Sequence, residues 1–187
     1  MELENIKNWW REVTKGPLGW VIYIALGVVL AIALNSGLSL VLSTDYPVVT
    51  VESDSMEPVL YPGDIVFVRS VEEYEPGDII VFDGWKETPI IHRVVSRSRR
   101  TDGTFEIDVW QDFDEITEDE MRDRHLELED EDFIYVTKGD NNPTCDQCQA
   151  TREMVLNRHV HGKQVFRVPY LGWIKLASMR FVGVVTA

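Results

Sequence analysis

Two serines, Ser53 and Ser55, lie in the stretch VESDSMEPVLYPGD, which begins a few residues after a long uncharged run. A serine hydroxyl is a weak nucleophile until a base accepts its proton, and histidine is the side chain best suited to that task near neutral pH. The chain has four histidines: His92, His125, His159 and His161. Taken alone, a histidine within a strand-like run such as PIIHRVV, which holds His92, is more often structural than catalytic. The residue types therefore permit a serine nucleophile with a histidine base, but they do not show which serine and which histidine act together.

A second group of reactive side chains lies in CDQCQATREMVLNRHVHG, where Cys145 and Cys148 form a C-x-x-C pair and His159 and His161 an H-x-H pair. Zinc accepts such donors in tetrahedral geometry, and residues i and i+2 of a strand share one face. The two cysteines could instead form a disulfide, as is common outside the cytoplasm, or remain free thiols. We expect no resident metal or cofactor, and keep zinc on these four residues and the disulfide as open alternatives.

The segment before these groups has the character of a membrane anchor. Residues 16–44 have no charged side chain over 29 positions, and a helix needs about 20 apolar residues to cross roughly 30 Å of hydrocarbon. A cleaved signal peptide would have an apolar region of only about 7–15 residues, so we expect a retained transmembrane helix over residues 18–43. The basic residues before the span, Lys7, Arg11 and Lys15, have no Lys or Arg counterpart between the span and Arg69. Segment 1–17 should therefore be cytoplasmic and the rest extracytoplasmic.

Beyond the span, the pattern changes to short runs rich in Val, Ile and Phe and bounded by Pro, Gly or Asp, which is typical of β-strands. The runs are PVVTVE, DIVFVRS, DIIVFDG, PIIHRVVSRS, TFEIDVW, DFIYVTKG and KQVFRV. They predict a mainly β domain over residues 45–173. Within it, residues 111–132 carry twelve carboxylates, and we interpret them as a solvated insert, either a loop or a short helix. The apolar tail 174–187 is too short to span a membrane unaided, and it could lie on the membrane surface, form a last core element or begin a second span.

The composition limits the classes of function. The chain has 187 residues, which suits one domain, and a formal net charge of −14. Such a charge repels phosphate groups, so nucleic acid is excluded as a partner. Lysine is scarce and the Asp plus Glu count reaches 32, a composition that resembles proteins of salt-loving archaea.

The motifs SDSMEP, GDIIVF, IHRVV, TKGDNN and KQVFRVPYLGW occur in the order of the successive conserved boxes of type I signal peptidases. The chain resembles this family over the anchor and most of residues 48–173. A histidine in IHRVV, where the bacterial enzymes have a lysine, makes it similar to the archaeal and endoplasmic-reticulum branch. The resemblance implies a signal-peptidase-like β catalytic domain behind an N-terminal transmembrane helix, and a serine endopeptidase that removes signal peptides after small residues.

The resemblance also implies roles for individual residues. Ser55 matches the nucleophile and His92 the general base, while the Ser53 hydroxyl and the Ser55 N–H match the donors of an oxyanion hole. Asp140, in KGDNN, and Asp146 both match acidic positions of the family. One of them should orient His92, and Asp146 is the slightly preferred partner.

Two alternatives to this enzyme remain from the sequence. One is a catalytically inactive, membrane-tethered binding module of the same fold, and the other is an extracytoplasmic metal-binding module. The expected partners are the signal peptides of secretory preproteins, the lipid bilayer and the protein-translocation machinery. The expected location is the cell membrane of a halophilic archaeon, as a single-pass protein with a cytoplasmic N-terminus.

Overall fold

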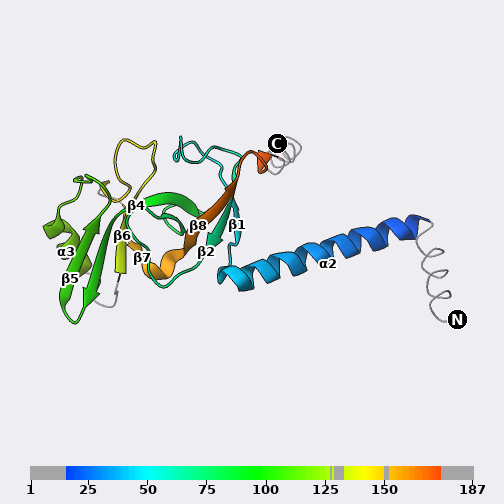
Figure 1. Cartoon of the computed structure of the whole chain (residues 1–187), viewed down its shortest axis with the longest axis horizontal. Coiled ribbons are helices and arrows are strands. Elements are labelled where there is room, and N and C mark those ends of the chain that lie inside the picture. The colour runs from blue at the N-terminus through cyan, green and yellow to red at the C-terminus, as the bar shows by residue number, and fades with distance from the viewer. Residues whose placement is uncertain (1–15, 127, 129–132, 150–151, 174–187) are drawn as a thin grey trace. The chain divides into compact units, whose positions relative to one another are not determined.

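A computed structural model describes residues 16–126, 128, 133–149 and 152–173 (Figure 1). The tail 174–187, the basic residues that precede the span and part of the acidic insert lie outside the described residues. The chain divides into two units, Met1–Val41 and Leu42–Ala187.

The first unit is dominated by helix α2, Pro17–Leu42. Its part from Gly19 to Leu42 has a mean hydropathy of 2.2, and large apolar side chains along it, such as Ile24, Leu30 and Leu34, are exposed. An apolar helix of 24 residues exceeds the length of about 20 residues that a bilayer requires. The helix is therefore long and apolar enough to cross a membrane.

The second unit is built on one antiparallel sheet in the spatial order β1-β2-β8-β3-β4-β6-β7, with β5 paired to β4. Each of the seven predicted runs holds a strand, and β7 is a short strand that the sequence patterns did not predict. The mainly β fold with an N-terminal apolar helix is confirmed. The strands are β1 Val48–Thr50, β2 Ile65–Arg69, β3 Ile79–Phe82, β4 Ile90–Thr101, β5 Thr104–Val109, β6 Phe133–Lys138, β7 Val155–Leu156 and β8 Val160–Val168, and a 3-10 helix covers Asn157–His159.

The position of β8 joins two parts of this sheet that are otherwise separate. On one side it pairs with β2, and on the other with β3, in both cases antiparallel. Strands β1 and β2 precede β3 in the chain, yet no pairing between β2 and β3 occurs among the described strands. Strand β8, the last of the described strands, therefore connects the β1-β2 hairpin to the rest of the sheet.

The core follows from alternation along the strands. In β2, Val66 and Val68 are fully buried while their neighbours are less so, as expected when one face of a strand packs inward. Strand β3 is buried along its whole length, since other segments cover both of its faces. Tyr135 of β6 donates a hydrogen bond to Asn157 Oδ1 at 3.0 Å, and burial raises the pKa of its hydroxyl, so it remains a neutral donor.

The acidic insert is less solvated than its charge predicts. It contains helix α3, Glu118–Leu126, in which Met121 is fully buried. Met121 and Ile116 pack in one core cluster with Val95 of β4 and Val136 of β6. The insert is therefore attached to the sheet through its apolar residues, while most of its described carboxylates are exposed.

Candidate active site

Ser55 lies in the segment between β1 and β2, on a tight turn. The turn is closed by hydrogen bonds from Glu57 N to Asp54 O and from Leu60 N to Met56 O. Met56 and Leu60 are fully buried in the cluster that also holds Val66. Burial of the residue directly after Ser55 fixes the turn, so that the serine hydroxyl is held at the surface of the core.

The loop after β6 supports the same turn from the other side. Asn141 N donates a hydrogen bond of 2.8 Å to Ser55 O, and Asn141 Nδ2 reaches Asp54 O at 3.2 Å. A Cβ added at Gly139 would lie 2.7 Å from Ser55 O, closer than carbon and oxygen can approach. Glycine at position 139 is thus what allows the two loops to meet.

His92 comes from β4, where it pairs across the ladder with Ile80 of β3. Its Nε2 lies 3.1 Å from Ser55 Oγ and its Nδ1 lies 2.5 Å from Asp146 Oδ2. The imidazole is 5% exposed. With the Nδ1 proton donated to the carboxylate, Nε2 is left as the acceptor for the serine proton, which is the arrangement of a Ser-His-Asp triad.

Asp146 is held from several sides in a buried position. Its backbone N donates to Thr137 O at 2.8 Å, and Thr137 Oγ1 donates to its Oδ2 at 2.8 Å. Arg152 Nη1 donates to the other oxygen, Oδ1, at 3.2 Å. The carboxylate is 1% exposed and is oriented toward the imidazole.

Asp140 lies elsewhere. It forms a two-bond ion pair with Arg93, in which Nε and Nη2 donate to the two carboxylate oxygens at 2.8 and 2.7 Å. Since neighbouring residues of a strand point to opposite faces, Arg93 projects away from His92, and its guanidinium packs over Trp110 at 4.6 Å from the ring centroid. The structure therefore brings Asp146, and not Asp140, to the imidazole.

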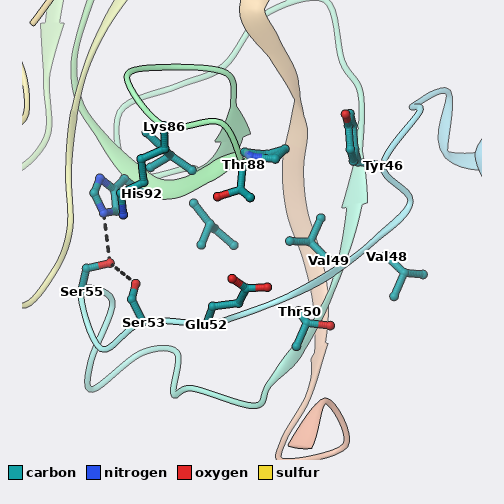
Figure 2. Close-up of a pocket in the computed structure, with 13 residues that line it drawn as sticks. Tyr46, Val48, Val49, Thr50, Glu52, Ser53, Ser55, Lys86, Thr88 and His92 are labelled. Atoms are coloured by element: carbon teal, nitrogen blue, oxygen red, sulfur yellow. Dashed lines mark hydrogen bonds between the residues drawn. The ribbon is translucent and has the colours of Figure 1, made fainter. Parts of the chain in front are cut away.

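Ser53 lies beside the nucleophile position, with its Oγ 3.1 Å from Ser55 Oγ (Figure 2). Both hydroxyls border a cavity of about 250 Å³. One wall of the cavity comes from β1 and the residues after it, and the other comes from residues 86–92. The walls combine apolar side chains, such as Val49 and Ile91, with the charged side chains of Glu52 and Lys86.

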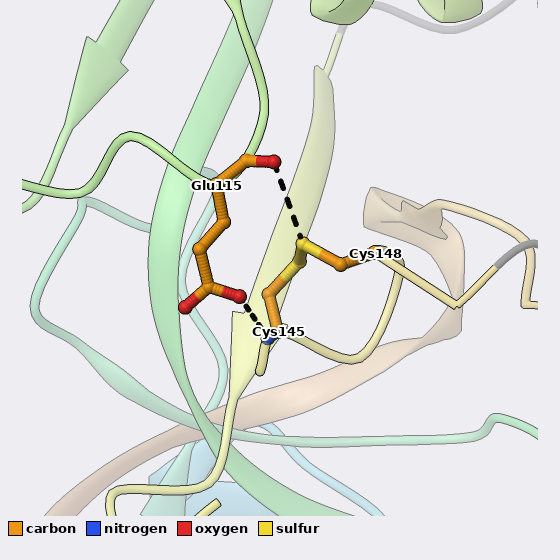
Figure 3. A group of neighbouring side chains, drawn as sticks. All are labelled: Glu115, Cys145 and Cys148. Atoms are coloured by element: carbon orange, nitrogen blue, oxygen red, sulfur yellow. Dashed lines mark hydrogen bonds between the residues drawn. A yellow bond between two sulfur atoms is a disulfide. The ribbon is translucent and has the colours of Figure 1, made fainter. Parts of the chain in front are cut away.

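The two cysteines form a disulfide with Asp146 between them (Figure 3). Cys145 is buried, and its backbone N donates to Glu115 Oε2 at 2.7 Å. Among the described residues, the cysteines are grouped with Glu115 and not with a histidine. The two sulfur atoms are bonded to each other, so they do not serve as a pair of zinc thiolates in this state.

The two late histidines do not share a strand face, contrary to the expectation for H-x-H. His159 ends the 3-10 helix, while His161 lies in β8 and packs on Tyr46 with ring centroids 4.3 Å apart. The change from helical to extended backbone between them breaks the two-residue alternation. The structure therefore does not assemble the four zinc candidates.

The remaining histidine, His125 of α3, lies with its Nδ1 2.8 Å from Ser98 Oγ. Both side chains are fully buried, so no peptide could reach that serine. This pair is part of the packing between α3 and β4.

Replacement of Cys145 and Cys148 by serine should lower the free energy of unfolding by about 2 kcal/mol, because the denatured chain loses a small closed loop. The measurement is the midpoint of guanidinium unfolding of the purified chain in detergent. Wild-type protein treated with a dithiol reductant should show the same decrease. An unchanged midpoint in both samples would show that the disulfide contributes nothing to stability.

The sequence patterns assigned no role to Thr137 or Arg152. Thr137 is the first residue of the TKGDNN motif, where its hydroxyl could have suggested a partner for a nearby carboxylate. Arg152 follows Asp146 by six residues in an irregular segment, and no periodicity there predicts its direction.

The sequence of this chain is similar to those of known proteins over most of its length. Residues 24–105 match the Peptidase S24-like family, a range that includes Ser55 and His92. The chain is 33% identical to the signal peptidase complex catalytic subunit SEC11 of Schizophyllum commune, over 91% of this chain and 82% of that protein. The SEC11 protein of Komagataella phaffii is 32% identical, over 83% and 80%, and SEC11C of Canis lupus familiaris is 26% identical, over 89% and 75%.

Proposed function

Because the chain belongs to the family of signal peptidase catalytic subunits, serine peptidases that remove signal peptides, we propose that Ser55, His92 and Asp146 are its catalytic residues. The observation that carries this assignment is the continuous line of contacts from Ser55 Oγ through the imidazole to Asp146 Oδ2, at 3.1 and 2.5 Å. The three residues come from segments far apart in the sequence. Their convergence at one end of a cavity supports a functional reason for the arrangement.

The reaction follows from this geometry. His92 Nε2 accepts the proton of Ser55 as Oγ attacks the carbonyl carbon of the scissile peptide bond. The tetrahedral intermediate collapses when His92 gives that proton to the leaving amine, which becomes the N-terminus of the mature protein. The signal peptide is left as an ester on Ser55. A water molecule, deprotonated by His92, then hydrolyses the ester and restores the serine hydroxyl.

Asp146 contributes to both steps without accepting a proton. It keeps the Nδ1 proton of His92 in place and stabilises the imidazolium that forms when Nε2 is protonated. Thr137 and Arg152 keep the carboxylate in line with the ring. Asp140 has a structural role in this proposal, since its carboxylate is occupied by Arg93.

Ser53 and the backbone N–H of Ser55 are the proposed donors to the oxyanion. Ser53→Ala should lower kcat by about a hundredfold to a thousandfold, the usual cost of losing one such donor. The check is the initial rate of preprotein cleavage at saturating substrate. Ser53→Thr retains the hydroxyl and should restore most of the rate. A kcat that is equal in the alanine variant and the wild type would remove Ser53 from the mechanism.

Substrate specificity is proposed to be steric. The signal peptide would lie extended in the cavity between β1 and residues 86–92, with small side chains before the cleaved bond. The direct test uses the full chain in detergent, a purified preprotein at high salt, and mass measurement of the product N-terminus. We expect one cut after a small residue, and no cut when that residue is replaced by tryptophan. Absence of cleavage of any preprotein would favour an inactive module.

We also propose that the chain is a single-span membrane protein with its catalytic domain on the extracytoplasmic side. Its helix α2 meets the length requirement, and the relatives are named as subunits of a signal peptidase complex. Association with further subunits and with the protein-translocation machinery of the cell membrane belongs to the same proposal. The test is whether externally added protease reaches residues 45–173 in intact cells.

A further inference from the structure

Arg152 makes two contacts that lie on either side of the proposed triad. Its Nη1 donates to Asp146 Oδ1 at 3.2 Å, and its guanidinium carbon lies 3.9 Å from the ring centroid of Trp85. The arginine side chain is 23% exposed while the carboxylate is 1% exposed. The charged end of Arg152 therefore reaches from the surface to a buried catalytic group.

The two oxygens of Asp146 have different partners. Oδ2 accepts from His92 and Thr137. In the described part of the chain, the hydrogen bond to Oδ1 comes from Arg152. A buried carboxylate oxygen without a donor is costly, and the group then turns or recruits water to recover one. Arg152 thus fixes the rotation of the carboxylate about the bond that aims Oδ2 at the imidazole.

Trp85 connects Arg152 to the substrate cavity. It lies between β3 and β4, directly before Lys86, and Lys86 and Thr88 belong to the cavity wall. Its ring centroid is 6.5 Å from that of His92. A guanidinium stacked on an indole is an attractive contact that limits movement of both groups. The wall of the cavity and the catalytic carboxylate therefore share one support.

We propose that Arg152 is a positioning residue that orients Asp146 through Oδ1 and holds the substrate-cavity wall in place through Trp85. The inference rests on the proposed function, since it assigns a role relative to the Ser55-His92-Asp146 site. It separates into two effects. The ion pair acts on the chemical step, and the stacking contact acts on substrate binding.

The charge of Arg152 should also affect the dependence of kcat/KM on pH, on the acidic side of its maximum. The groups facing His92 are Asp146 at Nδ1 and Ser55 at Nε2, with Arg152 behind the carboxylate; Lys86 and Glu52 line the same cavity. A positive charge beside Asp146 offsets part of the attraction between the carboxylate and a protonated imidazole. Without it the imidazolium is more stable, so the acidic limb of kcat/KM should move to higher pH.

The test compares Arg152→Gln, Arg152→Lys and Trp85→Leu in the full chain in detergent, with kcat, KM and the pH profile measured on one preprotein. Arg152→Gln should lower kcat by about tenfold to a hundredfold, the effect of a small misplacement of a catalytic group, and raise the pH of the acidic limb. Arg152→Lys keeps the charge and should restore the limb and much of kcat. Trp85→Leu should raise KM several-fold and leave the limb unchanged.

Arg124→Gln is the matched control, because Arg124 also holds this loop, through Gln147 O at 3.0 Å, and loses the same charge without a bond to Asp146. It should keep the wild-type kcat and profile. Equal kcat and acidic limbs in wild type and Arg152→Gln would overturn the inference, as would equal losses in Arg152→Gln, Arg152→Lys and Arg124→Gln. If Arg152→Gln does not fold, Trp85→Leu decides by its KM, which must rise several-fold above the wild-type value. Failure of wild-type cleavage would instead reject the proposed function.

Discussion

Ser55→Ala is expected to lower the rate of preprotein cleavage by at least about four orders of magnitude, because the reaction loses the atom that attacks the peptide bond. His92→Ala should lose as much, since a serine without its base is protonated at neutral pH. The double variant should be no slower than either single variant, because the two residues act as one unit. The measurement is single-turnover cleavage by purified protein in detergent, followed over days to detect slow residual turnover.

The matched control for this result is Ser98→Ala. Ser98 is the other serine in hydrogen-bond reach of a described histidine, at 2.8 Å from His125 Nδ1, yet it is fully buried. Cleavage by Ser98→Ala should stay close to the wild-type rate, even if its unfolding midpoint falls. Rapid cleavage by folded Ser55→Ala, or by folded His92→Ala, would reject the assigned nucleophile or base.

The second large effect separates the two acidic candidates. Asp146→Asn should lower kcat by about three to four orders of magnitude, because an amide NH2 group in place of Oδ2 donates to Nδ1 and holds the imidazole in the wrong tautomer, with its proton on Nε2. Asp140→Asn should leave most of kcat intact. Its cost should appear as a loss of about 3 kcal/mol in the free energy of unfolding, since Arg93 is left as a largely buried charge without its partner.

Both variants are compared by kcat at a temperature where each is folded and by guanidinium unfolding midpoints. An exchange of the two outcomes, with Asp140→Asn folded and inactive and Asp146→Asn active, would show that the acid is assigned wrongly. Equal losses of kcat in both would indicate that the loop after β6 acts through its overall position. The Arg152 variants then test how the correct acid is held.

Sequence patterns went furthest where chemistry depends on local motifs. Ser55 and His92 lie in SDSMEP and IHRVV, and the strand-like runs around them predicted the mainly β fold. Those features depend on residue type and short spacing. The motifs and the strand-like runs can therefore be recognised without knowledge of the three-dimensional contacts.

The choice between Asp140 and Asp146 could not be read in the same way. The two residues are six positions apart in one irregular loop, and spacing does not tell which one a turn directs toward β4. The deciding contact is with Arg93, which follows His92 and points to the other face of the strand. That pairing is long-range, and only the folded sheet displays it.

The contact between Arg152 and Asp146 could not be predicted from the sequence either. Arg152 contacts Asp146 and Trp85, and no repeat or hydrophobic pattern around position 152 predicts either contact. The acidic insert was interpreted as solvated because its charges dominate its composition. Its attachment includes two buried apolar residues, Ile116 and Met121, which contribute little to a composition with twelve carboxylates.

The place of β8 in the sheet has a consequence for the order of events during synthesis. Ser55 belongs to the hairpin β1-β2, and His92 to the strands that begin with β3, and β8 pairs with both. A ribosome delivers the serine, the histidine and the aspartate before it delivers Val160–Val168. Until that strand arrives, a growing chain has no continuous sheet to hold the serine against the histidine. The hairpin that carries Ser55 and the strand that carries His92 would therefore be joined in one sheet only after Val168 has been translated.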